Sequence, residues 1–258
     1  MNYIGIDIGS TCAKTVVLNE KKELILEFVQ PTGWSSVDTA EEIRQKLELS
    51  GINLSDDSSC CVATGYGRIS VPYADKTVTE ITCHALGAVH LFQHPDLTVI
   101  DIGGQDTKII QIEQGFVKDF IMNDKCAAGT GRFLEVMANT LSLRPNEMFD
   151  LARLGSDTTI SSMCTVFAES EVIGLIGKGE PKENIAYAVV NSTIRKVAAQ
   201  VSRMNGEMSA FCLTGGLCEC DYIREALSKE LGKDVVSCPD ARYAGAIGAA
   251  LSAMKIRR

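Results

Sequence analysis

The run YIGIDIGST at residues 3–11 decides the fold, because it returns as TVIDIGGQD at residues 98–106. Each copy reads as an apolar strand with an aspartate near its end, followed by a glycine-containing turn. Two further strand-like runs follow each copy, at residues 14–18 and 24–29, and at 108–112 and 116–122. Two three-stranded meanders, each followed by helices, predict a duplicated α/β fold made of paired domains, not a solenoid.

Hydrophobic periodicity predicts the remaining elements of both halves. We expect helices at residues 37–49, 80–92, 127–141, 166–176, 185–204, 221–231 and 243–254, and strands at residues 59–64, 209–213 and 234–237. The boundary is expected near Pro95 and Asp96, which gives an N-terminal domain of residues 1–95 and a C-terminal domain of residues 96–258. The second half holds the extra helices, so distinguishing features of this chain are expected there.

The composition is that of an ordinary folded protein and excludes several classes of partner. The net charge is −8 and no Lys/Arg run is present, which disfavours binding to nucleic acid or to an anionic membrane. No window reaches the ~18 consecutive apolar residues of a membrane span. Residues 1–4 lead straight into a strand-like run without a basic or apolar leader pattern, so a cytoplasmic location is expected.

The turns after the two aspartate-bearing strands have the composition of phosphate-binding turns. Gly9, Ser10 and Thr11 form the first turn, and Gly103, Gly104 and Gln105 form the second. Small residues let backbone N–H groups converge on phosphate oxygens, although any one such turn, taken alone, also fits an ordinary tight hairpin. The repetition of the turn favours a nucleotide site.

Two carboxylates and a third turn complete this candidate site. Asp7 and Asp101 are suited to a hydrated Mg²⁺ that bridges phosphates, because Mg²⁺ keeps several waters and takes few protein ligands. Gly215 and Gly216 follow the strand at residues 209–213 and can bring backbone against an adenine or a ribose. Neither phosphate turn is a Walker motif or a G-x-G-x-x-G fingerprint, which disfavours P-loop and Rossmann folds.

With these three motifs the chain resembles the superfamily of actin, sugar kinases and heat-shock chaperone ATPases. The resemblance implies two ribonuclease-H-like domains, of the actin-like ATPase type, with a nucleotide cleft between them. It also implies that Asp7 and Asp101 bind Mg²⁺ through water, that Lys14 lies near the phosphates, and that Gln105 positions the attacking water. ATP and ADP are the expected nucleotides.

Two of the ten cysteines stand at positions expected to open helices. Cys126 precedes the helix expected from residue 127, and Cys164 precedes the helix expected from residue 166. The positive end of a helix dipole favours a thiolate, and thiolates are the ligands of iron–sulfur clusters. A 4Fe-4S cluster needs about four of them, so two per chain predict one cluster on the twofold axis of a homodimer. The alternative is that each is a small buried apolar residue.

The other cysteines and His84 have simpler interpretations. Cys60 and Cys61 are adjacent in a strand and point to opposite faces, so they cannot chelate together. His84 is interpreted as a structural or surface residue. Four cysteines lie in the C-terminal part of the chain: Cys212, Cys218, Cys220 and Cys238. Their spacing lacks a paired C-x-x-C, which disfavours a metal site made from them.

A closer resemblance rests on four runs: ATGYGR at residues 63–68, DIGGQD at 101–106, residues 123–132 around Cys126, and CTVFAESE at 164–171. They resemble the activators of 2-hydroxyacyl-CoA dehydratases, in the BadF/BadG/BcrA/BcrD ATPase family. The resemblance implies a 4Fe-4S cluster held by Cys126 and Cys164 of both subunits. It further implies ATP-driven transfer of one low-potential electron to a dehydratase or a related acceptor, with a ferredoxin or flavodoxin as donor.

Two other functions remain open at this point. A small-molecule kinase of the same superfamily would transfer the γ-phosphoryl group to a hydroxyl and would give no role to Cys126 and Cys164. A chaperone-like ATPase or nucleotide sensor is disfavoured, because no peptide-binding domain follows the second half. In the activator, ATP hydrolysis is coupled to electron transfer and not to phosphorylation of a substrate.

Overall fold

The structure is a computed structural model that describes the chain except for residues 55–56, 124, 162–163, 207–209 and 257–258. The chain divides into two compact units, Met1–Leu97 with Ile110–Lys118 and Cys238–Arg258, and Thr98–Ile109 with Asp119–Ser237. The first passage between them, after Leu97, lies close to the predicted boundary at residue 95. The C-terminal helix, by contrast, groups with the first unit, whereas the linear division of the sequence puts it in the second domain.

The first sheet has the strand order β3-β2-β1-β4-β5. Its strands are β1 (Asn2–Ile8), β2 (Cys12–Leu18), β3 (Leu24–Pro31), β4 (Ser59–Thr64) and β5 (Lys76–Thr77). β1 pairs with β2 in antiparallel fashion and with β4 in parallel fashion. In this register Asp7 lies opposite Lys14 on one side and Thr64 on the other, so the aspartate lies at the end of β1 where the first turn and the loop after β4 begin.

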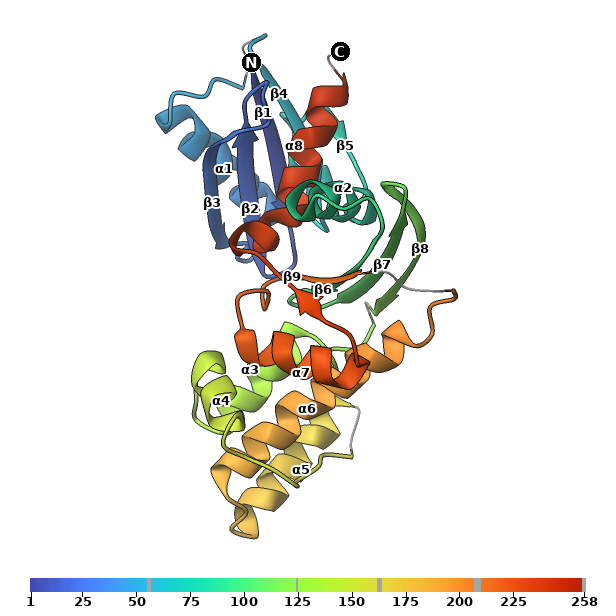
Figure 1. Cartoon of the computed structure of the whole chain (residues 1–258). Helices are drawn as coiled ribbons and strands as arrows, with labels where there is room; N and C mark the ends of the chain where they lie inside the picture. The colour runs from blue at the N-terminus through green and yellow to red at the C-terminus, as the bar shows by residue number, and fades with distance from the viewer. Residues whose placement is uncertain (55–56, 124, 162–163, 207–209, 257–258) are drawn as a thin grey trace. The chain divides into compact units, whose positions relative to one another are not determined.

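Helices cover both faces of this sheet. α1 (Ser36–Leu49) packs with Cys61 on one face, and α2 (Glu80–Phe92) and α8 (Ala244–Ile256) pack with Cys60 on the other. Figure 1 shows the red C-terminal helix α8 alongside the blue strand β1. The prediction that Cys60 and Cys61 point to opposite faces is therefore confirmed, and both are buried in apolar cores.

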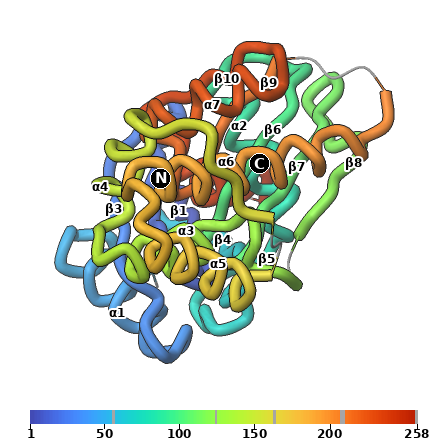
Figure 2. The backbone as a smooth tube through the Cα atoms, turned by 90° about the horizontal axis from the view of Figure 1, so that it is seen from below, coloured from blue at the N-terminus to red at the C-terminus, as the bar shows by residue number. Residues whose placement is uncertain are grey.

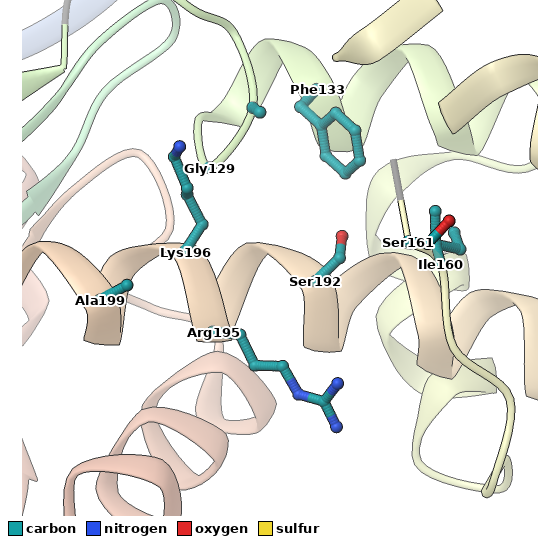
Figure 3. Close-up of a pocket in the computed structure, with 9 residues that line it drawn as sticks. Gly129, Phe133, Ile160, Ser161, Ser192, Arg195, Lys196 and Ala199 are labelled. Carbon is teal, nitrogen blue, oxygen red and sulfur yellow. The ribbon is translucent and has the colours of Figure 1, made fainter. Parts of the chain in front are cut away.

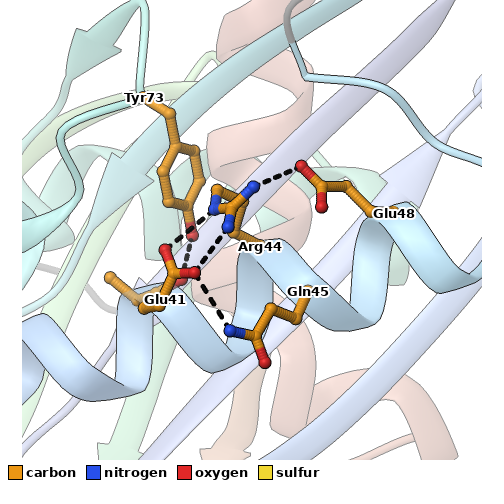
Figure 4. Close-up of polar contacts among 6 residues, drawn as sticks. Glu41, Arg44, Gln45, Glu48 and Tyr73 are labelled. Atoms are coloured by element: carbon orange, nitrogen blue, oxygen red, sulfur yellow. Dashed lines mark hydrogen bonds and ion pairs between the residues drawn. The ribbon is translucent and has the colours of Figure 1, made fainter.

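The outer face of α1 carries a network of charged side chains (Figure 4). Arg44 pairs with Glu41 and Glu48, each at 2.5 Å, and Gln45 donates to Glu41 at 3.0 Å. Hydrogen bonds from the Arg44 guanidinium lower the pKa of Glu41 to about 2. On the inner side of the helix, the Tyr73 hydroxyl donates to the Ala40 carbonyl at 2.6 Å.

The second sheet repeats the first, with the order β10-β9-β6-β7-β8. Its strands are β6 (Leu97–Ile102), β7 (Thr107–Glu113), β8 (Phe116–Asn123), β9 (Ala210–Gly215) and β10 (Val235–Val236). β9 and β10 pair in parallel fashion, as β4 and β5 do. The duplication predicted from the two aspartate-bearing runs is confirmed at the level of the whole sheet.

Three helices are inserted in the second half between β8 and the long helix α6 (Lys182–Val201). They are α3 (Gly131–Thr140), α4 (Pro145–Ala152) and α5 (Thr165–Gly177). α3 to α6 pack together (Figure 2), and α7 (Asp221–Leu231) packs on α6. α4 was not predicted, although Pro145 in its first turn and the capping contact of Glu147 are signals for a helix start. Along the described chain no helix combines the length and the apolar character needed to cross a bilayer.

The start of α3 differs from the prediction. The helix begins at Gly131 and not at residue 127, because Gly129 has a φ of +86° that an α-helix cannot contain and Thr130 is extended. A turn precedes it, closed by the Thr130 N–H donating to the Ala127 carbonyl at 3.0 Å. Cys126 therefore lies five residues before the helix and not at its N-terminus.

Candidate functional site

The Asp7 carboxylate lies in a close-fitting environment. Its side chain is buried, and Nε2 of His84 on α2 lies 4.0 Å from Asp7 Oδ2. Glycines face both oxygens: a Cβ on Gly65 would overlap Oδ1, and a Cβ on Gly245 would lie 2.5 Å from Oδ2. The position of the carboxylate is therefore defined by one imidazole and by two backbone segments that come close only because they carry no side chain.

The Asp101 carboxylate is held by different partners. It is buried, Thr214 Oγ1 donates to its Oδ1 at 2.8 Å, and Lys108 Nζ lies 3.4 Å from its Oδ2. Lys108 is itself buried and lies 2.7 Å from a second carboxylate, Asp106 Oδ2. Thr214 begins the third glycine turn, so the structure brings the second phosphate turn and the third turn together through Asp101.

The two phosphate turns have the same backbone geometry. The Gly9 N–H donates to the Cys12 carbonyl at 3.1 Å, and the Gly103 N–H donates to the Asp106 carbonyl at 2.9 Å. Within the described part of the chain, no intramolecular hydrogen bond uses the N–H groups at the tips of these turns, which are those of Ser10, Thr11, Gly104 and Gln105. Free N–H groups on a small-residue turn are what a phosphate oxygen requires.

The glycine turn at residues 214–217 is also duplicated. Its counterpart was not identified from the sequence. Gly215 ends β9 with a φ of +86°, and the Gly216 N–H donates to the Ile102 carbonyl. Gly65 follows β4 with a φ of +84°, and the Gly67 N–H donates to the Ile8 carbonyl. The shared Thr-Gly pair after each strand was the available signal. The turn at residues 65–68 is thus the counterpart, in the first unit, of the predicted adenosine turn.

The lysines follow the same repeat. Lys14 lies on β2 opposite Asp7, half-buried, and Lys108 stands at the matching place of the second copy. Only Lys14 was predicted, although Lys108 makes the closer contacts with carboxylates. Gln105 is exposed at the tip of its turn. Asp7 belongs to the first unit, and Asp101 and Gln105 belong to the second.

Residues 125–132, which we call the Cys126 segment, are joined to the second phosphate turn by backbone hydrogen bonds. The Gly131 N–H donates to the Gly103 carbonyl at 2.9 Å, and the Arg132 N–H donates to the Gly104 carbonyl at 2.8 Å. Thr107 Oγ1 donates to the Gly129 carbonyl at 2.6 Å in a buried contact. The Asn123 amide donates to the carbonyl of Cys126 at 2.9 Å. Cys126 is half-buried, so the segment is held firmly while the thiol keeps some exposure.

Cys164 is exposed and is the N-cap residue of α5, as predicted. Its backbone is extended, and its carbonyl accepts the first hydrogen bond of the helix from Ala168 at 2.8 Å. Glu171 on the same helix accepts from the Ser161 N–H at 3.1 Å, which fixes the chain just before the cysteine. Cys164 therefore lies at the N-terminus of a helix, as predicted, and Cys126 does not.

A cavity of about 200 Å³ adjoins the segments next to both cysteines. Gly129 follows Cys126, Ser161 precedes Cys164, and both line the cavity together with Phe133 of α3 and Lys196 of α6. Figure 3 shows Lys196 extending from α6 towards Gly129, with Phe133 above the same helix. All these residues belong to the second unit.

The remaining cysteines have the surroundings of packing residues. Burial raises the pKa of the Cys83 thiol to about 12, and burial also raises the pKa of Cys220 and Cys238. Among the described residues, no three His, Cys, Asp or Glu side chains converge in a way that could hold a metal ion.

Comparison with known proteins identifies relatives over the whole chain. The model of the BadF/BadG/BcrA/BcrD ATPase family matches residues 4–253. The (R)-2-hydroxyglutaryl-CoA dehydratase activating ATPase of Acidaminococcus fermentans is 43% identical over 98% of this chain and 96% of its own. The activator of lactoyl-CoA dehydratase of Anaerotignum propionicum is 41% identical, with coverages of 98% and 97%.

A solved structure supports the same relationship. The activator of the 2-hydroxyisocaproyl-CoA dehydratase from Clostridium difficile, with bound ADPNP, superposes with a TM-score of 0.88 at 33% identity. The match covers 99% of this chain and 95% of that one. Together with the duplicated sheets, this similarity confirms the prediction of an α/β fold with two ribonuclease-H-like domains.

Proposed function

The chain belongs to the BadF/BadG/BcrA/BcrD ATPase family, and we propose that it is the ATP-dependent activator of a 2-hydroxyacyl-CoA dehydratase or a related acceptor. In this role it passes one electron to its partner enzyme. The observation that carries the proposal is the direct hydrogen bonding of the Cys126 segment to the second phosphate turn, through Gly131 and Arg132. A kinase of this fold has no use for such a connection.

The nucleotide part of the proposal uses the residues predicted from the sequence. The turns at Gly9–Thr11 and Gly103–Gln105 hold the phosphates through their unused N–H groups, and Gly215 and Gly216 lie against the adenosine. Lys14 lies near the phosphates, and Gln105, exposed at its turn, orients the attacking water. The products are ADP and phosphate, and no substrate hydroxyl is phosphorylated.

Mg²⁺ fits the carboxylates of the two copies. Asp7 and Asp101 offer hard oxygen donors, and the glycines beside them leave no Cβ in the space next to the carboxylate oxygens. Because Asp101 already accepts a hydrogen bond from Thr214 and faces Lys108, coordination through water suits it better than direct ligation. When bound, Mg²⁺ neutralises phosphate charge and holds the phosphates in the orientation that hydrolysis requires.

The cluster part of the proposal rests on the donor chemistry of two cysteines. Cys164 is exposed and Cys126 is half-buried, whereas five of the other eight cysteines are buried. Two thiolates per chain supply half of the four ligands of a 4Fe-4S cluster, so a homodimer with one shared cluster follows. When bound by Cys126 and Cys164, a cluster would supply one-electron transfer between a ferredoxin or flavodoxin and the acceptor.

The two parts are mechanically linked within the second unit. A change at the Gly103–Gly104 turn, caused by ATP binding or hydrolysis, alters the carbonyls that accept from the first turn of α3. Because Gly129 and Thr130 join α3 to Cys126 in a hydrogen-bonded turn, the displacement reaches a ligand after a few residues. Solvent exposure and hydrogen bonds at the sulfurs set the potential of a cluster, so such a shift changes reducing power.

The test is substitution of each ligand under anaerobic conditions. We expect the wild-type protein to contain about two iron atoms per chain, and Cys126→Ser and Cys164→Ser each to lose the cluster while still binding ADP. Iron and acid-labile sulfide are counted, and ADP affinity is measured by calorimetry. Cys220→Ser, at the N-cap of α7, is the matched control and should keep its iron. A complete cluster in either ligand variant would refute this assignment.

A further inference from the structure

The two duplicated aspartates differ in what holds them. Asp101 faces a buried ammonium and accepts a hydroxyl hydrogen bond, from Lys108 and Thr214. The matching positions of the first copy are Lys14 and Thr64, and within the described chain neither makes an ion pair or a hydrogen bond with Asp7 through its side chain. The repeat has therefore kept the aspartate, the lysine and the threonine, but only the second copy brings the lysine and the threonine onto the carboxylate.

In the first copy it is His84, on α2, that faces the aspartate. It is 4% exposed, and its Nε2 faces Asp7 Oδ2 at 4.0 Å. Asp7 is 5% exposed, so the pair is shielded from bulk water. No other Lys, Arg or His side chain of the described chain lies within 4.0 Å of the Asp7 carboxylate.

Backbone packing fixes the geometry of the pair. A Cβ on Gly245, in the first turn of α8, would lie 2.5 Å from Asp7 Oδ2 and 3.0 Å from His84 Nε2. Gly65 closes the other side of the carboxylate. A carboxylate enclosed in this way keeps a single orientation. One of its oxygens faces the imidazole of His84.

We propose that His84 is a positioning residue that orients the Asp7 carboxylate for the hydrated Mg²⁺ of the nucleotide site. Groups one step removed from a metal commonly fix the orientation of its ligands, and their loss costs about tenfold or more in metal affinity. The proposal rests on the proposed nucleotide function and adds to it a residue that was interpreted from sequence as structural. In this role His84 acts through the Asp7 carboxylate, which its Nε2 faces at 4.0 Å.

The experiment compares ADP affinity with Mg²⁺ and with EDTA, in the full-length protein. We expect His84→Leu to reduce the gain in affinity that Mg²⁺ provides by about tenfold, with little change in the affinity measured in EDTA. His84→Gln, whose amide nitrogen can lie near the position of Nε2, should retain most of that gain. His90→Leu, on the same helix, is the control and should behave as wild type.

A second substitution keeps the proposal testable if His84→Leu does not fold. Gly245→Ala pushes on Asp7 Oδ2 and should lower the Mg²⁺-dependent gain, whereas Gly174→Ala, which adds its Cβ in open space on α5, should not. The proposal is overturned if His84→Leu leaves the Mg²⁺-dependent gain in ADP affinity unchanged. If His84→Leu does not fold, the same result in Gly245→Ala overturns it. Equal losses with Mg²⁺ and in EDTA overturn it in favour of a structural role. A wild-type protein that binds no ADP in either buffer overturns the proposed function itself.

Discussion

At the scale of single residues, the same side chain type has different effects in different surroundings. Cys83 is buried and its thiol has a pKa of about 12, whereas Cys164 is exposed at a helix start. Asp7 and Asp101 are copies of one position, yet one faces an imidazole and the other an ammonium. Residue type alone therefore does not assign a role, and partners within a few ångströms do.

The Glu41–Arg44 pair on α1 gives a prediction about pH. The pKa of Glu41, about 2, lies below the ordinary value of 4.5, so ionisation of its carboxyl group stabilises the folded state. This contribution is fully present above about pH 4.5 and is lost as the pH falls through about 2. We expect the difference in free energy of unfolding between wild type and Arg44→Ala to be small, to stay constant from pH 6 to about pH 4.5, and to shrink as the pH falls further towards 2.

Urea denaturation at several pH values measures this difference. Lys21→Ala, which removes an exposed lysine that makes no ion pair among the described residues, is the control and should give a pH-independent difference. If the gap between wild type and Arg44→Ala grows in acid, the pair does not stabilise the fold in the way described.

At the scale of elements, the segment from Thr107 to Gly131 is the part of the fold on which the proposed coupling depends. Thr107 lies on β7 with no exposed surface, and its hydroxyl supplies the hydrogen bond that holds the Gly129 carbonyl. We expect Thr107→Val to lower the free energy of unfolding by about 1–2 kcal/mol, because a buried carbonyl loses its donor. The loosened turn should also make Cys126 react faster with iodoacetamide in the iron-free protein.

Alkylation followed by mass spectrometry separates the two cysteines. The rate at Cys164 should not change, because α5 starts independently of this turn. Thr98→Val is the matched control, since Thr98 Oγ1 is buried on β6 without a hydrogen-bond partner among the described residues. Equal acceleration at both cysteines would mean general destabilisation and would contradict the local connection between Thr107 and Cys126.

Elements with a local signal were predictable, and elements set by tertiary contacts were not. β4 and α2 have the predicted bounds because alternation and helical periodicity are properties of a short window. The start of α3 was predicted four residues early, because the contacts that fix it come from Gly103 and Gly104, more than twenty residues away. His84 had no local signal at all, since its partner Asp7 lies on a distant strand.

At the scale of the whole molecule, the chain returns to its first unit at the end. α8 packs against β1 and α2, and glycines make this possible: a Cβ on Gly248 would overlap the Cys83 carbonyl. A linear reading assigns α8 to the second domain because sequence order carries no information on which sheet a late helix covers. The return places Gly245 beside Asp7, so the C-terminal helix contributes to the candidate site.

The largest-scale prediction concerns assembly. Under the proposed function each chain offers two cysteine ligands, and α5, which Cys164 caps, carries exposed apolar side chains at Val166, Phe167 and Ile173. A cluster with ligands from both chains would link the two subunits covalently through its iron–sulfur bonds, in addition to carrying the electron. We expect the anaerobic protein to be a dimer by light scattering, and removal of iron by a chelator to shift it to a monomer that still binds ADP. Oxidised protein without iron should behave like the chelated sample. A dimer that survives complete loss of iron would show that protein contacts alone hold the subunits, and an iron-containing monomer would contradict the shared cluster.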